Sequence, residues 1–257
     1  MRHTFFSCRL FVMVFFLVAN SLFGNSVQSP YNSIILKVVN TMPEGGGYGT
    51  SPLAIKHLRE AIFISSGQLH VEAEQAKPSF CSEATYIVFL KTLILLNHRG
   101  LLPLSSEISG FLLPGNKADG HGIWGRWNAN GPGVARLFKA LGLGPNFTEL
   151  SAAQPGDFLK IFWTDEIGAS EHGHLVIYLG QEKKEGVDYI NFWSSNIPNG
   201  YGKKSVPRTR IHRMIFSRLT NPQAILSAPL LPETDPYLAS LLYRSITAKE
   251  VEALSRD

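Results

Sequence analysis

The segment from Ser79 to Gly100 is almost continuously hydrophobic and predicts a buried helix. Between Ala84 and Leu96 the apolar residues occupy nearly every face of such a helix, interrupted only by Thr85, Lys91 and Thr92. A helix that is hydrophobic on all sides is typical of a protein interior. The serine offers an N-terminal cap and the glycine a C-terminal stop. We therefore expect a central helix with Cys81 in its first turn.

Weaker signals predict further helices on both sides of this segment. Ile34 to Val39 is either a short strand or the start of a helix. Ser51 and Pro52 open a helix with an apolar stripe, which we expect to end before Gly67. Pro132 opens another helix that ends at the Gly142 to Gly144 stretch. A capping box from Thr247 to Glu250 predicts a C-terminal helix.

Strand patterns appear after residue 155. Phe158 to Trp163 alternates between apolar and polar residues, after a turn in which we expect Asp157 to serve as a turn residue. His174 to Leu179 and Asp188 to Ser194 predict an antiparallel hairpin across the polar turn from Gln181 to Gly186. Arg210 to Leu219 is a candidate for one more strand. Helices followed by antiparallel strands indicate an α+β fold.

Two loops contain candidate substrate contacts. The long loop from Pro103 to Gly131 is rich in Gly, Asn and Pro, and loops of this length are often functional. Its side chains suited to peptide or sugar contact are Trp124, Trp127, Asn128 and Asn130, although both tryptophans would equally well pack the loop onto the core. The glycines around Tyr48 form either a plain linker or a backbone that approaches a ligand closely, and Tyr48 is the candidate contact there.

The first 24 residues have the pattern of a secretory signal peptide. A short basic start precedes the apolar run from Leu10 to Ala19, and small residues follow it. This run is shorter than the roughly 20 residues of a membrane-spanning helix, so we expect an exported protein without a stable span, with an uncleaved N-terminal anchor as the alternative. Lys and Arg number 24 against 20 Asp and Glu, and the net charge of +4 gives no reason to expect a nucleic-acid partner.

Cysteine usage narrows the chemistry further. The chain has two cysteines, and Cys8 lies in the expected leader. The remaining Cys81 therefore makes an intermolecular link, is an inert buried residue, or is a reactive nucleophile. At a helix N-terminus, unpaired backbone N–H groups and the helix dipole lower the pKa of a thiol to about 3.5–7.5. That position favours a reactive Cys81.

His174 is the candidate partner of this thiol, because it begins a strand at the end of the expected sheet. Thiol catalysis requires an imidazole that takes the proton from sulfur and a third polar group that orients the imidazole. The expected hairpin places position 174 opposite position 193 or 194, so we expect the third group to be Ser194 or Asn196. Asn191 lies further along the strand and is less suitable.

A metal site and a phosphate-binding loop are the competing interpretations. His172 and His174 would place two ligands on one strand face, but only His121 and acidic residues remain as partners and no ligand spacing is complete. Neither of the glycine-rich segments at 45–49 and 131–133 is followed by the Lys-Ser/Thr of a phosphate loop. We therefore expect neither a metal nor a cofactor.

Three ordered motifs resemble those of the NlpC-like and CHAP-like cysteine peptidases and amidases of the papain-like superfamily. They are Ser79-Phe80-Cys81-Ser82, Pro155-Gly156-Asp157-Phe158 and Gly173-His174-Leu175-Val176-Ile177-Tyr178-Leu179-Gly180. The resemblance covers residues 79 to 196 and implies Cys81 as nucleophile and His174 as base. It also implies a papain-like fold, in which the helix bearing the nucleophile packs on an antiparallel sheet, and bacterial wall peptides as substrate. The third position of the family falls on Ser194 or Asn196.

These expectations divide the chain into a signal peptide (1–24), an N-terminal helical extension (25–78), a papain-like catalytic domain (79–220) and a C-terminal helical tail (221–257). The expected activity is cleavage of an amide bond in peptidoglycan, outside the inner membrane. A non-catalytic wall-binding module on the same fold and a thiol acyltransferase are the alternatives.

Overall fold

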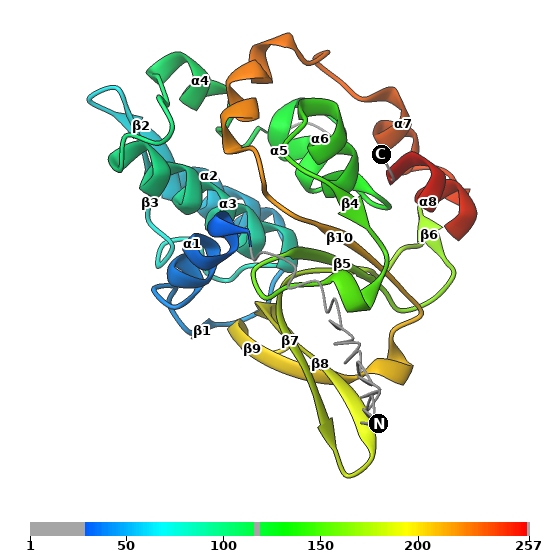
Figure 1. The fold of residues 1–257 in the computed structure, drawn as a ribbon. Coiled ribbons are helices and arrows are strands. Elements are labelled where there is room, and N and C mark those ends of the chain that lie inside the picture. The colour runs from blue at the N-terminus through cyan, green and yellow to red at the C-terminus, as the bar shows by residue number, and fades with distance from the viewer. Residues whose placement is uncertain (1–28, 116–118, 256–257) are drawn as a thin grey trace, which may run out of the picture.

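The computed structural model describes residues 29–115 and 119–255 and has an α+β fold built on a seven-stranded antiparallel sheet. The strands follow the order β1-β9-β8-β7-β5-β10-β4 (Figure 1). Their bounds in this order are Gly45–Gly46, Gly200–Pro207, Val187–Asn196, His174–Lys184, Phe158–Phe162, Arg213–Ser217 and Asn146–Phe147. The α+β class and the antiparallel sheet expected from the sequence are thus confirmed.

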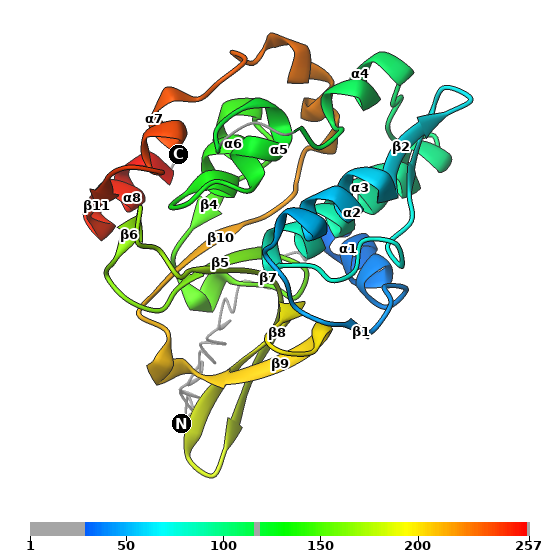
Figure 2. The ribbon, with the colours of Figure 1, turned by 180° about the vertical axis from the view of Figure 1, so that it is seen from behind.

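Helices α1 (Pro30–Val39), α2 (Pro52–Ala61) and α3 (Cys81–His98) lie together at one side of the sheet (Figure 2). Helix α3 packs directly on β7 and β8, and α1 packs on α3. The side chains at alternate strand positions, such as Leu175, Ile177 and Trp193, join the core beneath α3. The other alternate positions, such as Val176 and Phe192, belong to a separate apolar cluster on the opposite face.

Helix α3 forms where the hydrophobic pattern predicts it, with a difference at its first residue. The helix begins at Cys81 and its N-cap is Phe80 rather than the expected Ser79. The Glu83 carboxyl group, fully buried in the first turn, accepts a hydrogen bond from the Phe80 backbone N–H at 3.1 Å. The helix ends at His98, and Gly100 has the positive φ of a helix-terminating glycine. The thiol of Cys81 therefore lies at the N-terminal end of a buried helix, where backbone N–H groups have no partner within the helix.

The segment between α3 and the sheet is more ordered than expected. The predicted loop contains α4 (Ser106–Phe111) and α5 (Gly122–Trp127), and α6 (Gly133–Leu141) follows and ends at left-handed Gly142, as predicted. The short apolar groups in the loop were too brief to predict helices by periodicity, because each helix has fewer than two turns.

The chain before α3 also differs from its sequence expectation. The helix expected to continue toward Gly67 ends at Ala61, and Gly67 lies in the turn of a hairpin made by β2 (Ile62–Ser65) and β3 (Gln68–Val71). Gly45 and Gly46 are not part of a plain linker, because they form the edge strand β1 on β9. Ile34 to Val39 is helical.

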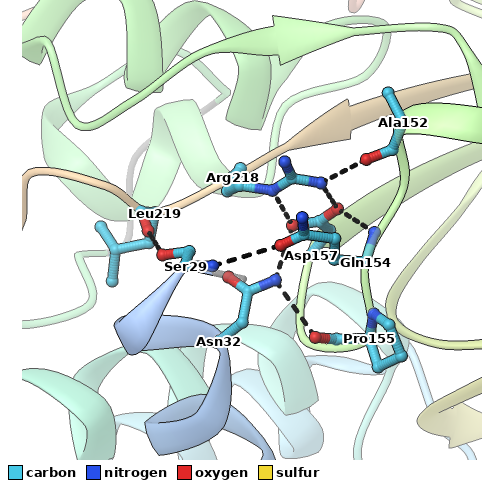
Figure 3. Close-up of polar contacts among 8 residues, drawn as sticks. All are labelled: Ser29, Asn32, Ala152, Gln154, Pro155, Asp157, Arg218 and Leu219. Atoms are coloured by element: carbon cyan, nitrogen blue, oxygen red, sulfur yellow. Dashed lines mark hydrogen bonds and ion pairs between the residues drawn. The ribbon is translucent and has the colours of Figure 1, made fainter. Parts of the chain in front are cut away.

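Asp157 is more than a turn residue, because it is fully buried at the centre of a polar cluster (Figure 3). Its two carboxylate oxygens accept hydrogen bonds from Arg218 Nε at 2.8 Å and Nη2 at 2.7 Å. Asn32 Nδ2 and the backbone N–H of Gln154 each donate to Asp157 at 2.8 Å. This cluster fastens α1 to the start of β5 and the end of β10.

The C-terminal part of the chain wraps over α5 and α6 (Figure 1). It contains η3 (Pro222–Leu230), α7 (Pro236–Ser240), β11 (Ser245–Ile246) and α8 (Ala248–Ser255), and β11 pairs with β6 (Ile167–Gly168). The remaining short turns are η1 (Leu150–Ala152) and η2 (Arg208–Arg210). At the capping box, the Glu250 backbone N–H donates to Thr247 Oγ1 at 3.2 Å, so the helix start is confirmed.

The hydrophobic core joins the three ranges expected to form an extension, a catalytic domain and a tail. One buried cluster includes Ile35 of the first range, Phe89 of the second and Ile225 of the third. The expected signal peptide lies outside the described residues. Across the described ranges, no helix has the length and hydrophobicity needed to cross a membrane.

Candidate active site

The thiol of Cys81 opens into a cleft with a volume of about 510 Å³ at the end of the sheet. The cleft is bounded by the start of α3, the segments around Tyr48 and Asn130, and strands β7, β8 and β9. The Cys81 residue is partly exposed and makes no disulfide. The nucleophile candidate is therefore accessible to a ligand rather than sealed in the core.

The cleft favours the thiolate form of Cys81. Burial raises the pKa of the thiol, but a hydrogen bond to His174 and the charge of that ring lower it. A backbone hydrogen bond from Leu175 and the charge of Lys160 act in the same direction, and the pKa falls from its ordinary 9.0 to about 7. A substantial fraction of the sulfur is consequently ionised at neutral pH.

Asn196 orients the imidazole of His174. The His174 Nε2 atom lies 3.2 Å from Asn196 Oδ1, which leaves Nδ1 for the sulfur. The Asn196 amide has a defined orientation, because Nδ2 donates to the carbonyls of Ser194 at 3.1 Å and Gly202 at 2.8 Å. Oδ1 is thus the atom that faces the ring, and it accepts a hydrogen bond from Nε2–H. The tautomer that results has its free lone pair on Nδ1, ready to accept the thiol proton.

The structure separates the two candidates for the third role. Ser194 Oγ donates to the Leu175 carbonyl at 2.8 Å and is fully buried away from the imidazole. The hairpin turns at Glu185 and Gly186. A register shift lies between Tyr178 and Gly180, and beyond it Ile177 pairs with Trp193. Continued to the strand end, this register places Asn196 rather than position 193 or 194 opposite His174.

Tyr48 reaches the nucleophile from the glycine-rich segment before α2. Its backbone N–H donates to the Pro198 carbonyl at 3.1 Å, and it forms a bridge with Ser79 next to the start of α3. Burial, the charges of Cys81 and Glu83, and a hydrogen bond to Cys81 raise the pKa of Tyr48. The phenol therefore stays protonated and acts as a donor beside the sulfur.

The four candidate residues of the long loop have different surroundings. Asn128 lines the cleft and accepts a hydrogen bond from Ser82 Oγ at 2.5 Å, and Asn130 lines it while donating to the Gly168 carbonyl at 2.9 Å. Trp127 lines the cleft but is 1% exposed, with its Nε1–H bonded to Thr85 Oγ1 at 3.2 Å. Trp124 is buried against Tyr86 and does not line this cleft. The tryptophans thus mainly pack the loop onto α3.

Lys160 and Glu171 contribute to the site and were not predicted. Lys160 forms an ion pair with the almost fully buried carboxylate of Glu171, and both line the cleft. Glu171 also accepts hydrogen bonds from the backbone N–H groups of Gly131 at 2.5 Å and Gly168 at 3.3 Å. The sequence signal was Lys160 in the apolar strand Phe158–Phe162, where a lysine needs a partner.

The three histidines considered as metal ligands do not gather. His172 and His174 line the cleft, whereas His121 lies elsewhere, with Nδ1 3.1 Å from Thr234 Oγ1 and Nε2 3.6 Å from Glu233. In residues 29–115 and 119–255, no cluster of three His, Cys, Asp or Glu side chains is arranged to hold a metal ion.

Comparisons with protein-family models, with curated proteins and with solved structures found no significant match to this chain. The chemistry of the site is therefore argued from its own geometry.

Proposed function

We propose that this protein is a cysteine hydrolase with a papain-like arrangement, in which Cys81 is the nucleophile, His174 the base and Asn196 the orienting group. The observation that carries the proposal is the meeting of these three side chains, from α3, β7 and β8, in one accessible cleft. A buried structural cysteine would need neither an accessible cleft nor an oriented imidazole.

The geometry supports nucleophilic attack on an amide carbonyl. The Cys81 thiolate forms a bond to the carbonyl carbon, and the resulting oxyanion receives hydrogen bonds from the Cys81 backbone N–H and the Tyr48 hydroxyl. The imidazolium of His174 donates its proton to the departing amine, and a thioester to Cys81 remains. Water then attacks the thioester, His174 takes a proton from that water, and the carboxylate product leaves with the thiol restored.

We propose wall peptides of peptidoglycan as the substrate class. The apolar run from Leu10 to Ala19 supports export to the compartment in which murein lies. The motif resemblance of residues 79 to 196 supports an amide bond in the stem peptide, either after the γ-D-glutamyl residue or at the sugar–peptide junction. The amide side chains of Asn128 and Asn130 supply polar contacts in the cleft.

Digestion of purified murein sacculi tests this proposal. The wild-type protein is expected to release soluble fragments that mass spectrometry identifies as products of amide cleavage, and the Cys81→Ala and His174→Ala variants are expected to release none. Matching thermal melts would show that the variants are folded. Absence of fragments with the wild type, or equal release by Cys81→Ala, would overturn the proposal. A new amide or ester in place of a free carboxylate would identify an acyltransferase instead.

A further inference from the structure

The charges around the cleft are strongly asymmetric. Among the described residues that line it, the single carboxylate is Glu171, which is already held by Lys160 and by two backbone N–H groups. Lys204 and Arg210 also line the cleft, and both are exposed. Apart from the Cys81 thiolate, the described lining therefore presents two unpaired cations and no carboxylate without a cationic partner.

Lys204 lies on the side of His174 that faces away from α3, and Arg210 lines the same cleft. In the pairing of β8 with β9, Lys204 lies opposite Phe192, and Phe192 belongs to the apolar cluster on the sheet face opposite α3. The His174 ring contacts Phe192 edge-on at 5.6 Å and stacks on Trp163 at 6.3 Å between centroids. We call the group of Trp163, Phe192, Lys204 and Arg210 the cationic shelf.

Neither cation of the shelf has an acidic partner in the described chain. Lys204 Nζ reaches only the Ile197 carbonyl, at 3.5 Å, and no ion pair to Arg210 is found across the described ranges. The neighbouring basic residue Arg213 differs, because it pairs with Asp165 and Glu252. Two uncompensated cations beside an aromatic surface suit a carboxylate attached to a small organic group.

The shelf lies on the leaving-group side of the proposed reaction. His174 donates its proton to the departing amine, so that amine and the residue attached to it must lie next to the imidazole. The shelf continues from the imidazole through Trp163 and Phe192. We infer that Lys204 and Arg210 determine specificity by binding an anionic group, a carboxylate, on the amine product of the cleaved bond. This inference rests on the proposed function and specifies that the substrate carries a negative charge on the leaving amine.

The test uses the full-length protein and the disaccharide-tripeptide released from sacculi by a muramidase, together with the same compound in which only the carboxylates of the diamino acid are methylamides. The expected result is faster cleavage of the carboxylate form by the wild type. In the Lys204→Met/Arg210→Met variant, KM for this form should rise about tenfold with little change in kcat. The preference of the enzyme for the carboxylate form over the methylamide form should disappear in this double variant.

Lys203→Met is the matched control. Lys203 is the adjacent exposed lysine of β9, it pairs opposite Trp193 rather than Phe192, and it does not line the cleft. This variant should keep the wild-type KM and preference. Equal cleavage of both substrate forms by the wild type, or an unchanged preference in the double variant, would overturn the inference while leaving the proposed function intact. Cleavage of neither form by the wild type would instead contradict the proposed function.

Discussion

Asn196 shows how one side chain determines the chemistry of another. Its amide nitrogen is bound to two backbone carbonyls, so its oxygen is held against His174 Nε2. This arrangement selects the imidazole tautomer that accepts a proton at Nδ1. A carboxylate in this position would add a charge, whereas the amide orients the ring without one.

Asn196→Ala is expected to lower kcat by about 10- to 100-fold with little change in KM, because the imidazole loses its orientation but the cleft keeps its lining. The loss should be smaller than the roughly 10²- to 10⁴-fold loss for removal of the base in His174→Ala. Steady-state kinetics on the disaccharide-tripeptide measures both parameters.

Ser194→Ala is the control for Asn196→Ala. Ser194 is the neighbouring polar residue of β8, and its hydroxyl donates to the Leu175 carbonyl rather than to the imidazole. This variant should lose some stability and retain most of kcat. A loss of kcat in Ser194→Ala as large as that in Asn196→Ala would contradict the assignment of the orienting role.

The first turn of helix α3 contains both the nucleophile candidate Cys81 and the buried side chain of Glu83. Glu83 is fully buried and caps the Phe80 backbone N–H, yet its Oε1 atom makes no hydrogen bond to described residues. Burial raises the pKa of Glu83 to about 8; the bond from Phe80 opposes this shift and the charge of Cys81 adds to it. At neutral pH the side chain is therefore mostly an uncharged acid, which places no full negative charge beside the thiolate.

This protonation predicts a pH dependence of stability. The unfolded chain releases the Glu83 proton near 4.5 and the folded chain retains it to about 8, so raising the pH across this interval lowers the free energy of unfolding. Glu83→Gln should remove this contribution, so that its stability relative to wild type improves as the pH rises from 5 to 8. Urea unfolding at several pH values measures the difference, and a difference that is independent of pH would contradict the burial argument.

The elements that the sequence predicted are those whose signals are local. The fully apolar run of α3 and the helix stop at Gly142 lie within their own segments, and so does the β7–β8 hairpin pattern. Strand β9 was missed because Gly200–Pro207 has few apolar residues, and its pairing with β8 supplies the strand conformation. Asn196 was among the two candidates, but choosing it required both the turn at Glu185 and Gly186 and the register shift in β7, and the sequence located the turn only within Gln181 to Gly186.

At the scale of the whole molecule, the Asp157 cluster joins segments that are distant in the sequence. Asn32 of α1, Asp157 before β5 and Arg218 after β10 meet in one buried network (Figure 3). The Ser29 hydroxyl adds a bond to the Leu219 carbonyl at 2.9 Å. The sequence showed a Gly-Asp turn but not its distant partners, because nothing in the local pattern identifies Arg218 or Asn32.

Asp157→Ala is expected to lower the free energy of unfolding by about 3–5 kcal/mol, because it leaves Arg218 and Asn32 without their buried acceptor. The exposed pair of Lys56 and Glu60 provides the control, with side chains 65% and 56% exposed. Lys56→Ala should change stability by less than about 0.5 kcal/mol. Urea unfolding measures both variants, and a similar small effect for both would show that the buried cluster does not hold the fold together.

The central claim is that the fold brings His174 to Cys81 and thereby makes a reactive thiolate, and alkylation of Cys81 against pH tests it without a substrate. Iodoacetamide labelling, quantified by mass spectrometry of the peptide containing Cys81, should give a midpoint of about 7 for the wild type. In His174→Ala the midpoint should rise from about 7 toward the ordinary value of 9.0, because burial raises the pKa and the hydrogen bond and charge of His174 no longer oppose it. The same midpoint in both proteins, or a wild-type midpoint near 9.0, would contradict the account.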